Sequence, residues 1–182
     1  MTQRLLRLSL AHYRKDSCTE ESCHYFGTAL HAKQAATLHA KHGTLQYYQV
    51  GAISPICKSK YSRVVISWRG QVYSTQAARD ALDAFRRSLG ADWTIDQHDL
   101  TVELYIRDLQ TLRNIAADPE FASFYHLEEP YLSRRHVVAS LGWVEAYVEE
   151  GKVVNVTDEG SEYRPGFGEF VGSGGELEKA LA

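Results

Sequence analysis

The sequence has few cysteines, and their arrangement excludes two common classes of small protein. The 182 residues include three cysteines, Cys18, Cys23 and Cys57, which form neither an even set nor a CxxC pair. A disulfide-stapled fold needs paired cysteines, and a zinc site needs several Cys, His or carboxylate ligands at close spacing. We therefore expect free thiols in a reducing, cytoplasmic environment, and no metal.

The sequence also lacks the motifs that identify nucleotide cofactors, serine hydrolases and membrane segments. It has no glycine-rich phosphate loop, no GxSxG turn and no apolar run approaching the roughly 18 to 20 residues of a membrane span. Arg4 and Arg7 interrupt the apolar stretch at the N-terminus, which makes it a poor signal peptide. The 20 basic and 23 acidic residues are interspersed, so the chain has no basic footprint for a phosphate backbone. These absences predict a cytoplasmic protein without a cofactor, a membrane partner or a nucleic-acid partner.

Hydrophobic patterning predicts an α+β fold. With 44% hydrophobic residues, the chain is long enough for one core. Six segments carry clear patterns, in chain order the strand 4–15, the helix 20–42, the strand 44–50, the strand 99–108, the helix 109–126 (broken near Pro119) and the strand 136–148. The order β, α, β, β, α, β matches the ferredoxin-like arrangement.

Two stretches fit this plan badly. Residues 51–72 lie between the second strand and an extra predicted helix at 74–90. The C-terminus is rich in Gly and Glu, so we expect one domain over residues 1–157 and a flexible tail over 158–182.

The predicted sheet has two unlike faces. Leucines and valines suit the face under the helices, whereas Tyr13, Tyr48, Glu103 and Tyr105 suit a mixed face that a second copy of the sheet could close. This predicts a homodimer whose enclosed face holds a flat organic ligand, because ligand pockets are mostly apolar with a few placed polar groups.

Three histidines fall along one stripe of the first predicted helix. The stripe contains His24, Thr28, His31, Ala35, Leu38 and His42, at alternating spacings of four and three. Seven and eleven residues separate the successive histidines, which corresponds to rises of about 10 and 16 Å and is too far for a shared ion. A metal site is not expected here.

Several motifs resemble one family, the small fungal EthD-domain proteins, and within it the decarboxylases of anthraquinone and xanthone polyketide clusters. The matching pieces are HYRK at 12–15, His31 on its helix, KHG at 41–43, GADWTIDQHDLTVELYIRDLQTL at 90–112, DPEF at 118–121 and SLGWVEAYVEEGKVVN at 140–155. The resemblance implies a dimeric α+β barrel that acts on an aromatic polyketide without a cofactor. The decarboxylases of this group are assigned to loss of carbon dioxide from acids such as atrochrysone carboxylic acid.

The resemblance directs the choice of catalytic residues. Decarboxylation leaves an enolate, which needs hydrogen-bond donors and an acid that returns a proton to carbon. We expect His31, at the position of the family's helix histidine, to act as acid or base, with Tyr105 as donor and Glu103 as relay. An ordinary structural role remains open for each: a helix histidine bonded to a neighbour, a packed tyrosine, and a cross-strand ion pair of Glu103 with an arginine.

The remaining predicted site residues are aromatic. Tyr13 and Tyr48 are expected to share the pocket-facing side with Tyr105, and Trp93 and Trp143 could wall a flat polycyclic substrate or serve simple packing. The same fold could also host a polyketide cyclase, a dehydratase, an anthrone oxygenase or a noncatalytic polyketide-binding protein.

The resemblance also isolates residues 51–72. Without them, YYQV joins YSTQAARDAL and the family pattern is continuous, and the segment starts after one QV pair and ends in another. We hypothesise that it is translated from a retained intron. The alternative is a genuine surface loop, which is tolerated because closure entropy grows slowly with length.

Overall fold

The centre of the fold is an antiparallel sheet. The structure is a computed structural model that describes residues 5–50, 72–149 and 151–163. Four long strands lie in the order β2-β4-β1-β5, namely β2 (Gln46–Val50), β4 (Leu100–Ile106), β1 (Leu5–Arg14) and β5 (Leu132–Val144). The two central strands are the first and third long strands of the chain, as in a ferredoxin-like fold, so the predicted α+β class is confirmed. The described part of one chain forms an open sheet, and the dimeric barrel stays a prediction.

Alternation along the central strands gives the sheet its apolar face. Leu8 pairs with Leu104 and Leu10 with Val102 across the β1–β4 ladder. These side chains point to the same side because successive residues of a strand alternate between faces. They form a cluster with the buried Ile106, and this cluster faces the helices.

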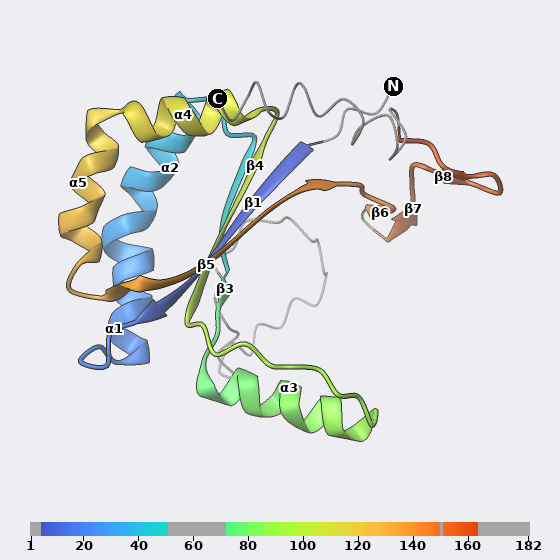
Figure 1. Cartoon of the computed structure of the whole chain (residues 1–182), viewed down its shortest axis with the longest axis horizontal. Helices are drawn as coiled ribbons and strands as arrows, with labels where there is room; N and C mark the ends of the chain where they lie inside the picture. Colours follow the sequence, from blue (N-terminus) through green and yellow to red (C-terminus); the bar gives the residue numbers. More distant parts are fainter. Residues whose placement is uncertain (1–4, 51–71, 150, 164–182) are drawn as a thin grey trace, which may run out of the picture.

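Helices cover one face of the sheet (Figure 1). The first crossover is a continuous helical rod built from α1 (Glu20–Tyr25), the π-helix η1 (Phe26–His31) and α2 (Ala32–Lys41). A capping box between Thr19 and Ser22 begins it. It ends before Gly43, whose φ of 81° is the left-handed conformation that commonly ends a helix and that glycine adopts without strain. The predicted regular helix over 20–42 is therefore correct in extent but not in its middle turn, which is widened.

The second crossover is broken where proline predicts it. α4 (Leu109–Ala117) and α5 (Pro119–Glu128) meet at Asp118, whose ψ of 128° is extended. The Asp118 carboxylate accepts a hydrogen bond from the backbone N–H of Glu120 at 2.9 Å and caps α5. α5 thereby turns so that its inner face lies over α2 and the sheet (Figure 1).

The remaining elements lie away from this helix layer. The helix α3 (Gln76–Ser88) extends beyond one end of the sheet, and two small hairpins follow β5 (Figure 1). The hairpins pair β6 (Val148–Glu149) with β7 (Lys152–Val153) and β8 (Val156–Thr157) with β9 (Gly160–Ser161). Tyr163 is buried, and its hydroxyl accepts a hydrogen bond from the backbone N–H of Ala146 at 2.7 Å. The ordered chain thus continues past Asp158, where we expected the flexible tail to begin.

The backbone register on both sides of the unusual segment is continuous. Val50 at the end of β2 and Val72 at the start of β3 (Val72–Tyr73) both pair with Thr101, and Tyr73 pairs with the next residue of β4, Leu100. Joining Tyr73 directly to Val50 would therefore leave the register unbroken. Residues 51–71 themselves lie outside the described residues.

A helix can cross a bilayer only if it has about 20 predominantly apolar residues. Among the residues that the structure describes, no helix is long and apolar enough to span one.

Candidate active site

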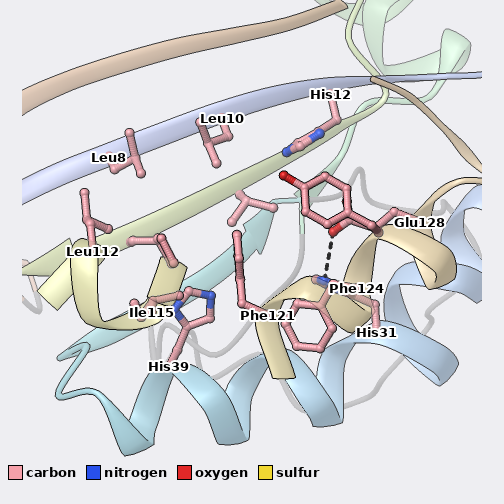
Figure 2. A pocket seen from close by; sticks show the side chains of 14 residues that line it. Leu8, Leu10, His12, His31, His39, Leu112, Ile115, Phe121, Phe124 and Glu128 are labelled. Atoms are coloured by element: carbon pink, nitrogen blue, oxygen red, sulfur yellow. Dashed lines mark ion pairs between the residues drawn. The ribbon is translucent and has the colours of Figure 1, made fainter. Parts of the chain in front are cut away.

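A cavity of about 280 Å³ lies between the sheet and the helices α2, α4 and α5 (Figure 2). Its apolar lining consists of Leu8, Leu10, Val102, Leu104, Leu112, Ile115, Ala116, Phe121, Phe124 and Tyr125. Its titratable lining consists of His12, His31, His39 and Glu128. The volume is close to the lower end of the range for ligand sites, roughly 300 to 1,000 Å³, and a mostly apolar wall with a few polar groups is their usual composition.

His31 and Glu128 form the central polar pair of the cavity. His31 Nε2 lies 3.4 Å from Glu128 Oε1, and Figure 2 shows the two side chains, from η1 and α5, joined by this ion pair. The imidazole is held between two aromatic rings, with ring centroids 5.3 Å from both Phe26 and Phe124. A carboxylate beside a held imidazole fixes the ring orientation and stabilises its protonated form. This is the arrangement of an oriented general base.

Two further histidines contribute neutral imidazoles. Burial, with smaller effects from the charges of His31 and His42, lowers the pKa of His39 to about 4. Burial is also the main cause that lowers the pKa of His12. His39 Nδ1 lies 3.4 Å from the hydroxyl oxygen of Thr44. At neutral pH both rings are therefore uncharged, and an uncharged imidazole can both donate and accept a hydrogen bond.

The structure places Glu103 and Tyr105 on the other face of the sheet. Val102 and Leu104 line the cavity, so the alternation of β4 directs the residues between and after them away from it. There, Arg7 donates to Glu103 Oε1, and the Tyr105 hydroxyl donates to Glu103 Oε2 at 3.2 Å. Of the three predicted catalytic residues, His31 alone lines the cavity, whereas Glu103 and Tyr105 lie together elsewhere.

Three of the four predicted substrate-binding aromatics, Tyr13, Trp93 and Trp143, are not among the described residues that line the cavity. The Tyr13 hydroxyl donates to Asp96 at 2.7 Å, and Tyr13 borders a separate polar depression. Trp93 is 48% exposed and packs against Phe85, with ring centroids 6.3 Å apart. Trp143 is the register partner of Leu6 on β5.

Tyr48 pairs with Glu103 in the backbone register. Its side chain lies outside the part of the chain that the structure describes.

Sequence reasoning gave low weight to three residues that line the cavity. His12 continues the alternation of Leu6, Leu8 and Leu10, and this period could have placed it on the helix-facing side. His39 lies near the C-terminus of the predicted helix, where a histidine that complements the helix dipole needs no further role. Glu128 gives no signal in the sequence, because its approach to His31 depends on how α5 packs across the first crossover.

Metal ions in proteins are held by groups of His, Cys, Asp or Glu side chains at close spacing. Within residues 5–50, 72–149 and 151–163, no group of three or more His, Cys, Asp or Glu side chains is placed to hold an ion.

Fold and cavity together define a class, an α+β protein of ferredoxin-like topology with an imidazole–carboxylate pair in an apolar cavity. No family model matches the chain. The chain is 88% identical over 182 residues, covering all of both chains, to a protein of Aspergillus terreus (strain NIH 2624 / FGSC A1156) named "Putative oxygenase". At this identity and coverage, the chain belongs to the same family as that protein.

A second similarity is more distant. The "Dehydratase iacD" of Pestalotiopsis fici (strain W106-1 / CGMCC3.15140) is 20% identical over 154 residues, which are 85% of this chain and 96% of that protein. The first alignment spans the whole chain and therefore includes residues 51–72. The predicted dimer is tested by neither comparison.

Proposed function

We propose that this protein is an enzyme of fungal secondary metabolism that moves a proton to or from carbon in an aromatic polyketide, without a cofactor. The observation that carries the proposal is the 3.4 Å approach of Glu128 Oε1 to His31 Nε2 within an otherwise apolar cavity. The names of the two similar fungal proteins, an oxygenase and a dehydratase, support an enzymatic role. The sequence resemblance to polyketide decarboxylases supports the substrate class.

The cavity suits a flat, weakly polar substrate. Phe121 and Phe124 present aromatic rings from α5, and Leu10 presents an aliphatic side chain from the sheet (Figure 2). A substrate ring between these walls would place a carbon next to a carbonyl within reach of His31. His31 would take the proton and Glu128 would stabilise the imidazolium, a form of catalysis worth roughly a hundred- to ten-thousand-fold.

The neutral imidazoles supply the second requirement of this chemistry. Removal of the proton places negative charge on the carbonyl oxygen, and a preorganised donor aimed at that oxygen contributes several kcal/mol in a site from which water is excluded. His12 extends into the cavity from the sheet and His39 from α2 (Figure 2). Either ring can donate an N–H to the enolate oxygen while remaining uncharged.

Three candidate reactions each pass through an enolate. In decarboxylation, the electrons of the carbon–carboxylate bond form the enolate, carbon dioxide leaves, and protonated His31 returns a proton to carbon. In dehydration, His31 removes the proton and the enolate expels a β-hydroxyl, which leaves as water when protonated His31 returns that proton to it. In oxygenation, the enolate carbon combines with dioxygen to give a hydroperoxide, which loses water to form a new carbonyl.

Decarboxylation is the outcome that the resemblance favours. Oxygenation is the second candidate, because the protein that is 88% identical carries the name of an oxygenase.

The test is an assay of purified protein with an anthraquinone-type carboxylic acid and the corresponding anthrone, in deuterated buffer under air. Mass spectrometry reports loss of carbon dioxide, loss of water or gain of oxygen, and NMR reports deuterium at the acidic carbon. We expect His31→Gln to slow exchange and turnover by about a hundred- to ten-thousand-fold, and Glu128→Gln to slow them by a smaller factor.

Matched controls lie on the opposite face of the sheet. Tyr105→Phe and Glu103→Gln should leave both rates within about twofold of the unchanged protein, because neither side chain lines the cavity. If Tyr105→Phe abolished exchange while His31→Gln preserved it, the active site would be on the other face. Saturable binding of both compounds without exchange or turnover would replace the enzyme with a binding protein.

A further inference from the structure

The helix that carries His31 contains one turn of unusual geometry. The π-helix η1 covers Phe26–His31, and the backbone N–H of Ala32 donates to the carbonyl of Gly27, five residues earlier. α1 before it and α2 after it are regular α-helix. Single π-turns within α-helices are rare and occur frequently at functional sites. We infer that this widened turn is a positioning device that sets the His31 ring against Glu128, an inference that rests on the proposed function.

Burial along the helix shows that the widened turn holds one extra residue. Cys23 of α1 and the first two residues of η1, Phe26 and Gly27, are buried, and a regular helix would continue this row through Leu30 and Gln34. The row after the turn instead runs through His31, Ala35 and Leu38, each one position later than expected. Gln34 is exposed. The phase of the buried stripe therefore advances by one residue within η1.

The extra residue is not needed to bury either half of the helix. Ala29 lies within η1 and is exposed, and without it Cys23, Gly27, His31, Ala35 and Leu38 would fall on one stripe of a regular α-helix. A regular helix would therefore serve the core equally well. It would also be the commoner conformation, since π-turns are rare within α-helices.

The catalytic pair explains why the turn is wide. His31 is the last residue of η1, and its ring lies between Phe26, the first residue of η1, and Phe124 of α5. Closing the turn would shift the His31 backbone by a fraction of the 1.5 Å helical rise relative to Glu128. Catalytic geometry is sensitive to such displacements, since a shift of about 1 Å can cost about a hundredfold in rate.

The experiment compares two single-residue deletions in the full chain. Deletion of Ala29 closes the widened turn and keeps both buried rows in phase. Deletion of Ala36, which is exposed in the regular part of α2, is the control, because it turns Leu38 and His39 away from the core. We expect the Ala29 deletion to unfold at or above the urea midpoint of the unchanged protein, and the Ala36 deletion to unfold well below it.

Kinetics then separate positioning from a purely structural role. The Ala29 deletion should lower kcat by about ten- to a hundredfold with little change in KM. In a His31→Gln background, the same deletion should cause no additional loss, because the residue that it displaces is already inactive. Wild-type kcat in a stable Ala29 deletion would overturn the inference while leaving the proposed function intact.

Two other outcomes are also decisive. An Ala29 deletion as unstable as the Ala36 deletion would show that the extra residue serves the core and would overturn the inference. Wild-type turnover in His31→Gln alone would instead reject the proposed function, whatever the stability of the deletion variants.

Discussion

Protonation of His39 should destabilise the fold as the pH falls from 7 to 5. His39 is buried under the sheet beside Leu38, and burial lowers the pKa of its imidazole from about 6.5 to about 4. The unfolded chain therefore binds a proton at a pH where the folded chain does not. The sign follows from linkage, since stability rises with pH wherever the unfolded state binds more protons. The stabilisation is present above pH 6.5 and is lost as the pH falls toward 4.

The magnitude follows from the size of the pKa difference. Each unit corresponds to about 1.4 kcal/mol, so the full difference bounds the loss at roughly 3 kcal/mol. At pH 5 the unfolded imidazole is almost fully protonated and the folded one is mostly neutral, which gives a loss of about 2 kcal/mol. The lowered pKa of His12 acts in the same direction and adds to this loss.

Urea unfolding at pH 7 and pH 5, followed by tryptophan fluorescence, measures this difference. Protonation of Asp118 does not interfere at pH 5 and above. Its hydrogen bond from Lys41 is the main cause that lowers its pKa, so its contribution to stability is lost only at lower pH. His39→Asn should remove about 2 kcal/mol of the pH dependence. His24→Asn, which changes an exposed histidine of α1, should preserve it. An unchanged pH dependence in His39→Asn would show that the ring is not held neutral by burial.

Two further predictions concern stability and the unusual segment. Leu38→Ala should lower the free energy of unfolding by about 2 to 5 kcal/mol in chemical denaturation, because Leu38 is 0% exposed. Leu82→Ala, at a 44% exposed position of α3, should lower it by less than about 0.5 kcal/mol. Equal losses would contradict the burial of Leu38 in the core. Deletion of residues 51–72 should preserve the circular dichroism spectrum and shift the melting temperature by only a few degrees, because Val50 and Val72 share one register partner. A deletion variant that no longer folds would reject this prediction. Sequencing that finds the segment in all mature messages would reject a retained intron.

Most of the fold could be predicted because its elements carry local signals. The alternation of β1 and β4, the left-handed Gly43 and the break before Pro119 each follow from backbone preferences that need no tertiary context. The start of β5 could not be placed in this way. Its first two residues, Leu132 and Ser133, extend the strand because they pair with Arg14 and Tyr13 at the end of β1, beyond a register shift, and local propensity does not encode this contact.

The site was less predictable, since it depends on how separate elements pack. The resemblance indicated His31, but the face of the sheet was chosen from the tyrosines, and the cavity lies on the other face. The phase shift at η1 was also missed, because a fixed 3.6-residue period assumes a regular helix, whereas the buried row moves by one position within the widened turn. The approach of Glu128 to His31 follows from the packing of α5 against the first crossover and has no local signature.

The carboxylates of Glu103 and Glu128 lie on opposite faces of the sheet, and their partners favour the helix-facing side for acid–base chemistry. Glu103 accepts hydrogen bonds from Arg7 and Tyr105, and its hydrogen bond is the main cause that raises the pKa of the Arg7 guanidinium. The arginine compensates the charge of such a carboxylate whether or not a substrate is bound. Its interaction energy therefore changes little when charge develops on a reacting group. Glu128 instead faces an imidazole whose charge can change during a reaction. The attraction between the Glu128 carboxylate and the His31 ring is strongest when His31 is protonated. If His31 gains its proton in the transition state, Glu128 stabilises the transition state more than the ground state.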